Sequence, residues 1–255
     1  MPHLFRPSTP QNRYYAWFLA LHTRVDVLLL APLTESEFQK VEEAIRAELS
    51  AVERMGNRFN MESELSQAVA AAAVRPVSLS PELFSLLARC LQAHRETGGL
   101  FDITVNSPDF TPGLINAVQL TPFPDVPGGT LSFLRTNLPP MTQGVPTRQG
   151  GSSSIILDLS GILKGYALER LRVLLPSHGI TDALINLGNS SILSLGTNPS
   201  DIPSGQCLTT SGNATADRCH IRNPLTGKFI TGQRHVSVIT PNGIDGEILS
   251  ITRFL

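Results

Sequence analysis

The sequence predicts an α+β fold in which mixed and antiparallel sheets are flanked by helices. Segments with helical periodicity lie in the first part of the chain, whereas short apolar strands crowd the second part. The two kinds of segment do not alternate as the βαβ units of a parallel sheet would. The 255 residues suffice for one large domain or two small ones.

The first elements are predicted by periodicity and a capping signal. Residues 16–30 alternate in two pieces, with Val25, Val27 and Leu29 on one face, and predict either a pair of strands or one long bent strand. The sequence Thr34-x-x-Glu37 is a capping box, in which each side chain satisfies an otherwise unpaired N–H of the other residue. Apolar residues at helical spacing follow it, so we expect an amphipathic helix over residues 35–54.

A second helix and a long connection complete the first half. Ser80-Pro81 begins the helix, because proline is tolerated where no N–H is needed, and Thr97-Gly98-Gly99 ends it. Residues 107–152 are rich in proline and glycine, which indicates a long connection with one short strand at 130–134. Further strands are expected at 154–157, 183–187, 192–195, 207–210, 218–222 and 235–240, with a hairpin turn at Gly188-Asn189.

The composition is that of a soluble globular chain: 41% of residues are hydrophobic, 16% are charged, and the net charge is −1. A nucleic-acid partner is not expected, because its surface would need clustered Lys and Arg. The sequence has no run long and apolar enough to cross a membrane. It shows no secretory signal at its start, so we expect a cytoplasmic location, with an exported form whose leader has been removed as the alternative. Three cysteines without a CxxC spacing argue against a disulfide framework and a structural zinc site.

Residues 157–169, L-D-L-S-G-I-L-K-G-Y-A-L-E, are the most informative stretch. An apolar strand is expected to run into Asp158, turn at Ser160-Gly161, and open a helix whose first turn carries Lys164. A helix N-terminus attracts anions through its unpaired N–H groups and its dipole. A lysine there adds a full positive charge, which suits a phosphate or pyrophosphate. The alternative is a solvated Lys164 with Gly165 serving only close packing, and this segment leaves both interpretations open.

Other candidate segments are weaker when each is taken alone. In Gly98–Val105, G-G-L-F-D-I-T-V, Phe101 offers a ring and Asp102 an acceptor, although a helix end leading into a strand is the simpler explanation of this segment alone. Thr209-Thr210-Ser211-Gly212 follows a strand with three hydroxyls that could bind phosphate oxygens, or it is an ordinary turn. His220, placed in a strand before a proline turn, is either a proton acceptor or structural.

Carboxylates and hydroxyls also gather near the C-terminus. Asp245 and Glu247 are followed by Ser250 and Thr252. Such oxygens suit Mg²⁺, which prefers hard ligands in an octahedron, whereas solvated acidic residues are the simpler interpretation.

Six motifs occur in one order along the chain: S-E-L-S, G-G-L-F-D-I-T-V, D-L-S-G-I-L-K-G-Y-A-L-E, I-N-L-G-N, T-T-S-G-N and H-I-R-N-P-L-T-G. This order resembles the FAD:protein FMN transferases, the family once named thiamine-biosynthesis lipoprotein ApbE. The resemblance implies a single ApbE-like domain over residues 15–255, with the Pro/Gly-rich connection at 107–152. It also implies a transferase that uses FAD as donor and Mg²⁺ as cofactor. The enzyme would move FMN from FAD to a Thr or Ser hydroxyl of an acceptor flavoprotein and release AMP.

The resemblance also implies roles for individual residues. Leu100-Phe101-Asp102 is similar to the family's A-F-D, Asp158 and Lys164 to its FAD-contacting Asp and Lys, and Phe59 to a ring that packs on the flavin. The residues implied for FAD binding are Phe59, Leu100, Phe101, Asp102, Asp158, Lys164, Thr210, Ser211, Gly212, His220 and Ile221. Lys164 and His220 are the implied catalytic residues. The implied metal ligands are Gly161, through its carbonyl, Glu247 and Ile251.

The metal motif is where this chain departs most from the family's pattern. The family's A-D-A-x-x-T aligns with Gly246–Ile251, so Glu247 replaces the aspartate and Ile251 replaces the threonine, unless the register slips to Thr252. A paralogue that binds FAD as a carrier without transfer is therefore an alternative. A second is an FAD pyrophosphatase, in which water replaces the acceptor hydroxyl. A globular domain without flavin is the third.

Overall fold

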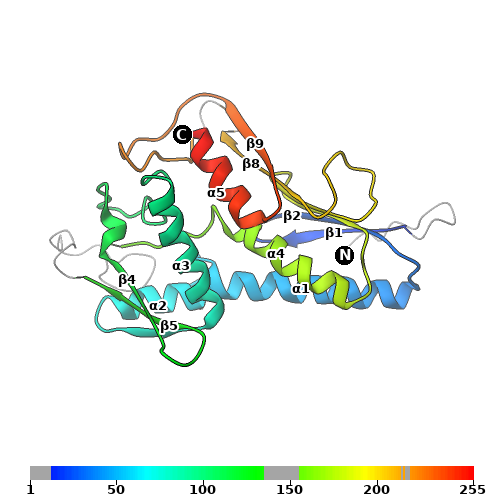
Figure 1. Cartoon of the computed structure of the whole chain (residues 1–255), viewed down its shortest axis with the longest axis horizontal. Coiled ribbons are helices and arrows are strands. Elements are labelled where there is room, and N and C mark those ends of the chain that lie inside the picture. Colours follow the sequence, from blue (N-terminus) through cyan, green and yellow to red (C-terminus); the bar gives the residue numbers. More distant parts are fainter. Residues whose placement is uncertain (1–12, 135–154, 214, 216–218) are drawn as a thin grey trace. The chain divides into compact units, whose positions relative to one another are not determined.

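A computed structural model describes residues 13–134, 155–213, 215 and 219–255 (Figure 1). The chain divides into two compact units, and each is described by itself. The first unit comprises the described parts of Met1–Val52, Gly161–Gly212 and His235–Phe254. The second comprises the described parts of Glu53–Ser160 and Asn213–Arg234, together with Leu255. The single domain expected over residues 15–255 stays a prediction.

The first unit is built on a six-stranded sheet with the order β1-β2-β6-β7-β8-β9. Its strands are β1 Arg13–Ala20, β2 Thr23–Leu30, β6 Ala183–Leu187, β7 Ser191–Leu195, β8 Cys207–Asn213 and β9 Arg234–Thr240. Neighbouring strands from β1 to β8 are antiparallel, with Val27 opposite Ile185 in the centre of the sheet. Side chains alternate across a sheet, and Val25, Val27 and Leu29 are fully buried on one face of β2.

Three helices lie wholly or mainly in this unit: α1 Glu35–Gly56, whose end from Glu53 falls in the second unit, α4 Leu163–Ser177 and α5 Gly243–Phe254. The capping box that precedes α1 is formed, since the Thr34 N–H donates to Glu37 Oε2 at 2.7 Å and the Glu37 N–H donates to Thr34 Oγ1 at 3.2 Å. Along α1, Phe38, Ile45 and Leu49 are buried, as their helical spacing predicts. Helices α4 and α5 pack against each other and against β7 (Figure 1).

The second unit contains α2 Glu64–Ala72, α3 Pro81–Glu96 and a three-stranded sheet of order β3-β5-β4. Its strands are β3 Val77–Leu79, β4 Val118–Pro122 and β5 Gly129–Phe133, and a short 3-10 helix, η1 Leu114–Ala117, leads into β4. The Ser80 hydroxyl caps α3 by accepting from the Leu83 N–H at 3.2 Å. Gly129 has no room for a side chain, because a Cβ there would lie 2.3 Å from Thr121 O and from the Phe84 ring.

Several predicted elements are confirmed. The strand pair over 16–30, the helix over 35–54 and the helix that begins at Ser80-Pro81 all form. So do the strands at 183–187, 192–195 and 235–240, and the turn at Gly188-Asn189, where both residues have positive φ. Helices α2 and α5 were not predicted.

The strand expected at 130–134 forms as β5, but the part of 107–152 that the structure describes, up to residue 134, also holds η1 and β4, which were not predicted; residues 135–152 lie outside the described residues. Two other expectations about strands were wrong. The strand expected at 154–157 is absent from its described part, residues 155–157. In 218–222, of which Arg218 is outside the described residues, the structure has only an isolated bridge between Arg222 and Phe229.

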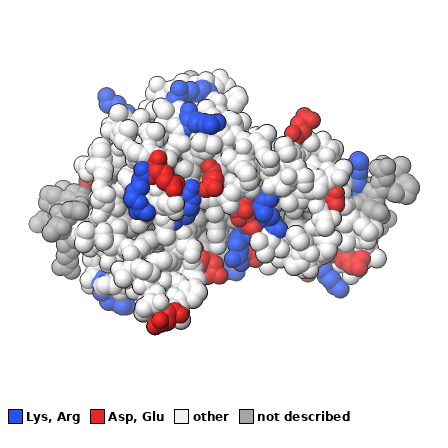
Figure 2. All heavy atoms as spheres, in the orientation of Figure 1, with Lys and Arg blue, Asp and Glu red and all other residues white. Residues whose placement is uncertain are grey.

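Within the described ranges, no helix combines the length and the apolar character needed to cross a bilayer. On the face of the molecule drawn in Figure 2, Lys and Arg lie interspersed with Asp and Glu. This mixture accords with the net charge of −1.

Candidate functional site

The segment that leads into Asp158 is extended but bonds to turns instead of a strand. Its N–H groups at Ile156 and Asp158 donate to Ser107 Oγ at 2.9 Å and to Ile103 O at 2.7 Å. One acceptor is a side chain and the other belongs to a turn, so no regular ladder forms. Within the second unit, the backbone N–H of Asp158 therefore connects this residue to the Leu100–Ile103 segment.

Asp158 is buried and fully paired. Its Oδ2 lies 2.8 Å from Arg58 Nε and accepts from Asn106 Nδ2 at 2.7 Å, while its Oδ1 accepts from the Ser160 N–H at 2.9 Å. The guanidinium of Arg58 also lies over the Phe59 ring, with Cζ 4.0 Å from the centroid. The structure therefore brings Phe59 and Asp158 together through Arg58, and the Phe59 ring remains 61% exposed.

Arg58 and Asn106 were missed by the sequence reasoning. Arg58 directly precedes Phe59, so its position beside a candidate ring was a signal that could have been used. Asn106 contacts a residue 52 positions away, and no local pattern indicates that pairing.

Asp102 keeps one buried oxygen without a hydrogen-bond partner. Its Oδ1 accepts from the Thr104 N–H at 2.7 Å and from Thr104 Oγ1 at 2.6 Å, whereas Oδ2 is buried and 3.7 Å from His94 Nδ1. Burial raises the pKa of Asp102, although the Thr104 hydrogen bonds and His94 act to lower it. A buried acceptor without a hydrogen-bond donor is costly. Asp102 Oδ2 is therefore a candidate to accept a hydrogen bond from a bound ligand.

The residues beside Asp102 are less exposed than expected. The Phe101 side chain is buried in the second unit, and its carbonyl oxygen lies 3.0 Å from His94 Nδ1. Leu100 is half-buried. The strand expected after Gly98-Gly99 is replaced by successive turns, so Phe101 packs in the core of the unit instead of offering a free ring.

Lys164 is the second residue of α4, as predicted, and belongs to the first unit. The residue that precedes the helix, Ile162, makes no side-chain cap. Instead, the buried carboxylate of Glu247 accepts the Gly165 N–H near the start of α4 and the Ser191 hydroxyl at 2.5 Å. Lys164 Nζ donates to Ser190 Oγ. Burial raises the pKa of Glu247 to about 7, although Lys164 and the two hydrogen bonds act to lower it.

The three predicted metal ligands do lie in one unit, but their chemistry does not fit Mg²⁺. The Ile251 side chain offers no oxygen, and its Cδ1 lies 3.1 Å from where a Cβ on Gly161 would be. The Glu247 carboxylate is 4% exposed and already accepts two hydrogen bonds. In the shifted register, the Thr252 hydroxyl donates to Ile248 O at 2.9 Å in its own helix. In the part of the chain that the structure describes, no three His, Cys, Asp or Glu residues are grouped to hold a metal ion.

The hydroxyls of 209–211 lie within β8, not after it as expected. Because side chains alternate along a strand, Thr210 and Ser211 point to opposite faces. Thr210 Oγ1 is 2.8 Å from Ser237 Oγ, and Ser211 Oγ is 2.8 Å from Ser250 Oγ under α5. Gly212 is half-buried.

His220 and Ile221 lie in the second unit, in a segment without regular structure instead of the expected strand. His220 is exposed, and the Ile221 carbonyl accepts from the Ile230 N–H at 2.9 Å. The candidate residues thus fall into two groups. The first unit holds Gly161, Lys164, Thr210, Ser211, Gly212, Glu247 and Ile251; the second holds Phe59, Leu100, Phe101, Asp102, Asp158, His220 and Ile221.

A sequence model of the ApbE family matches residues 21–255 of this chain. The chain belongs to the ApbE family. A relative from Chlamydia muridarum named FAD:protein FMN transferase is 26% identical over 197 residues, which are 77% of this chain and 60% of that protein. One of the same name from Klebsiella pneumoniae is 24% identical over 246 residues, covering 84% of this chain and 70% of its own length.

Solved structures show the same fold at low sequence identity. The flavin transferase ApbE from Vibrio cholerae aligns with a TM-score of 0.72 and 18% identity, over 96% of this chain and 87% of its own. The apo form of the flavinyl transferase ApbE from Pseudomonas stutzeri aligns with a TM-score of 0.74 and 15% identity, over 98% of this chain and 87% of its own. The predicted α+β, ApbE-like fold is therefore confirmed.

Proposed function

We propose that this chain is an FAD:protein FMN transferase, which moves FMN from FAD to a Thr or Ser hydroxyl of an acceptor flavoprotein. The observation that carries the proposal is the family match over residues 21–255, which includes the segment from Asp158 to Lys164. The two relatives described above carry this activity in their names. The proposal covers FAD as donor and a protein as acceptor.

In the first unit, we assign Lys164 to the diphosphate of FAD. A lysine in the first turn of a helix combines its own charge with the positive end of the helix dipole. Phosphoryl-type transfer depends mainly on positioning and on stabilising negative charge. Thr210, Ser211 and Gly212 remain candidates for FAD binding, with Thr210 the more accessible hydroxyl, because Ser211 is buried against Ser250.

In the second unit, we assign Phe59 and Asp102 the most direct contacts with FAD. The Phe59 ring is exposed and backed by Arg58, which suits stacking on a planar group. Asp102 offers its buried, unpartnered Oδ2 as an acceptor. Asp158 is paired with Arg58 and Asn106 and would hold Arg58 over the Phe59 ring. Leu100, Phe101 and Ile221 would contribute apolar walls or backbone groups to the FAD site.

In the proposed reaction the acceptor hydroxyl oxygen attacks the phosphorus of the FMN moiety. The bond from that phosphorus to the bridging oxygen breaks, and AMP leaves with that oxygen. The hydroxyl proton must pass to a base, and His220 is the candidate, since it is exposed and its imidazole has a nitrogen that can accept a proton. The Mg²⁺ that the resemblance implies stays a prediction. No step is assigned to it, because Gly161, Glu247 and Ile251 do not form a three-oxygen set.

The test is to incubate the protein with FAD and a Thr-containing acceptor peptide, and to measure covalent flavin and AMP together. Equal amounts of flavinylated peptide and AMP support the transferase. Tight FAD binding without AMP supports the alternative of an FAD carrier, which the hydrocarbon side chain of Ile251 at a predicted ligand position favours. AMP without labelled peptide identifies a pyrophosphatase.

A further inference from the structure

One face of α5 is fixed to the first unit by three polar contacts. The Gly243 N–H donates to Glu169 Oε1 at 2.8 Å, Glu247 accepts from Ser191 Oγ at 2.5 Å, and Ser250 Oγ lies 2.8 Å from Ser211 Oγ. Residues spaced by four and three positions share a helix face. The contacts therefore fix the rotation of α5 about its axis and its position along β7 and β8.

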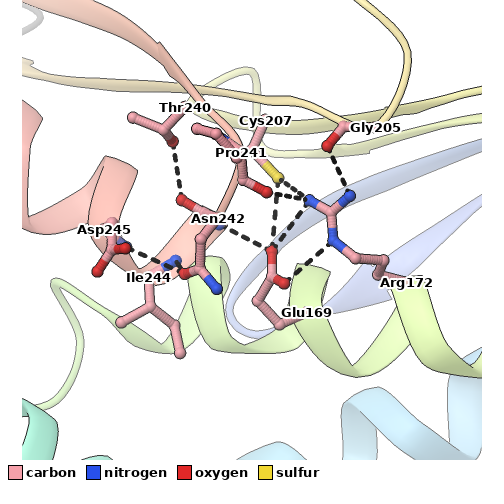
Figure 3. A network of polar contacts seen from close by, with 10 residues as sticks. Glu169, Arg172, Gly205, Cys207, Thr240, Pro241, Asn242, Ile244 and Asp245 are labelled. Atoms are coloured by element: carbon pink, nitrogen blue, oxygen red, sulfur yellow. Dashed lines mark hydrogen bonds and ion pairs between the residues drawn. The ribbon is translucent and has the colours of Figure 1, made fainter.

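The first of these contacts belongs to a larger network around Arg172 (Figure 3). Glu169 Oε2 is bound by Arg172 Nε at 3.0 Å, and Arg172 also donates to Gly205 O at 2.7 Å and to Pro241 O at 3.0 Å. The network joins α4 to the chain before β8 and to the turn before α5. It holds the N-terminus of α5 against α4.

The two helix backbones are also in direct contact. A Cβ on Gly165 would lie 2.3 Å from Gly243 O and 2.7 Å from Glu247 Cγ. Neither helix can slide past the other without breaking this contact. Glu247 is consequently held next to the first turn of α4, with little freedom to turn elsewhere.

In that position Glu247 does for α4 what a capping residue does. Its carboxylate accepts the Gly165 N–H, and a negative group near a helix N-terminus is favourable. The same carboxylate interacts electrostatically with Lys164, the second residue of the helix. Beside it, the hydrocarbon of Ile251 fills the space next to Gly161.

We propose that Glu247 is a positioning residue that anchors the N-terminus of α4 and holds Lys164 in place without a divalent cation. The hydrogen bonds of Glu247 thereby fix the N-terminus of α4, a role that a metal ion bound by Gly161, Glu247 and Ile251 would otherwise have. The inference deepens the proposed function, on which it rests only for the role of Lys164 toward FAD. The anchoring itself can be measured without nucleotide.

The first test is thermal unfolding of the full chain in MgCl₂ and in EDTA. A cation present at 100 times its Kd would raise the Tm by about 5–11 °C, whereas we expect a change below about 1 °C. Glu247→Gln, whose amide can keep both hydrogen bonds, should unfold at or above the wild-type Tm. Glu247→Ala should unfold several degrees lower, and by the same amount in MgCl₂ and EDTA.

The matched control is Asp245→Asn, which removes one negative charge from an exposed position on the same helix. It should leave the response to Mg²⁺ unchanged and lower the Tm by no more than about 4 °C, because Asp245 lies in the first turn of α5 and its charge interacts favourably with the helix dipole. The proposal is overturned if Mg²⁺ stabilises the wild type by more than about 5 °C and Glu247→Gln removes that stabilisation. It is also overturned if Glu247→Ala unfolds at the wild-type temperature.

The second test measures FAD affinity by quenching of flavin fluorescence in the same two buffers. We expect the Kd of wild type and of Glu247→Gln to agree within about twofold with and without Mg²⁺, and Glu247→Ala to bind about tenfold more weakly. An affinity that rises tenfold or more with Mg²⁺ contradicts the inference. If FAD binds in neither buffer, the proposed function fails, and the unfolding experiment alone then decides whether Glu247 is the anchor.

Discussion

At Gly165 the backbones of α4 and α5 are in close contact, and the cost of adding a methyl group there can be worked out. In Gly165→Ala the new Cβ would lie 2.3 Å from Gly243 O, where ordinary contact begins at 3.4 Å. The helices must therefore separate by about 1 Å. Such a separation also weakens the bond from the Gly165 N–H to Glu247.

The opposing terms set the expected magnitude for Gly165→Ala. Alanine in a helix gains about 0.5–1 kcal/mol over glycine, but overpacking costs about 1–3 kcal/mol and an impaired buried hydrogen bond about 1–3 kcal/mol. We expect a net loss of about 2–4 kcal/mol, or about 4–16 °C in Tm. Gly161→Ala is the comparison, because its Cβ meets only the flexible end of Ile251 at 3.1 Å; its cost should stay within about 1 kcal/mol.

The assay is thermal unfolding followed by circular dichroism, with both variants measured beside the wild type. A Gly165→Ala protein as stable as the wild type, or more stable, would refute the close contact of α4 and α5. An equal loss in Gly161→Ala would show that the effect is not specific to the helix crossing.

Three further predictions concern single side chains. Lys164→Ala should weaken FAD binding about tenfold or more while Lys164→Arg keeps most of it, as measured by flavin fluorescence; equal Kd values for Ala and wild type contradict the assigned role. The folded state raises the pKa of Glu247 from 4.5 to about 7, so the folded protein binds this proton more tightly than the unfolded chain does. Stability should therefore fall by about 3 kcal/mol as pH rises from about 4.5 to 7, and Glu247→Gln should remove this dependence in urea unfolding at several pH values. Burial raises the pKa of the Cys90 and Cys207 thiols to about 12, so only Cys219 should react quickly with a thiol reagent in the folded protein.

Helix α1 shows which parts of the fold could be predicted from the sequence. Its capping box and its apolar residues are local signals, and the structure reproduces both. Helix α5 was missed although Ile248 and Phe254 are buried on it, because its two glycines and Ser250 have low helix propensity. Its polar contacts from Glu247 and Ser250 to β7 and β8 join distant segments and leave no local signal. The strand expected before Asp158 failed for a related reason, since an apolar run does not reveal that its N–H groups bond to a serine side chain and a turn.

The candidate site could be predicted where a motif is local. Lys164 lies in the first turn of a helix, as the sequence indicates. The partners of Asp158 could not be predicted, because Arg58 and Asn106 are brought to it by contacts between distant segments. The carboxylate of Glu247 was predicted as a metal ligand from the resemblance of Gly246–Ile251 to the family's metal motif. Only the structure shows that the Gly165 N–H and the Ser191 hydroxyl already bind it.

The proposed activity is tested most directly by the mass of an acceptor peptide after incubation with the protein and FAD. We predict that a Thr-containing peptide gains the mass of FMN less one water, that AMP appears in equal amount, and that Lys164→Ala reduces both. A wild-type protein that binds FAD but yields neither product, with Mg²⁺ or without it, would contradict the proposed transfer of FMN.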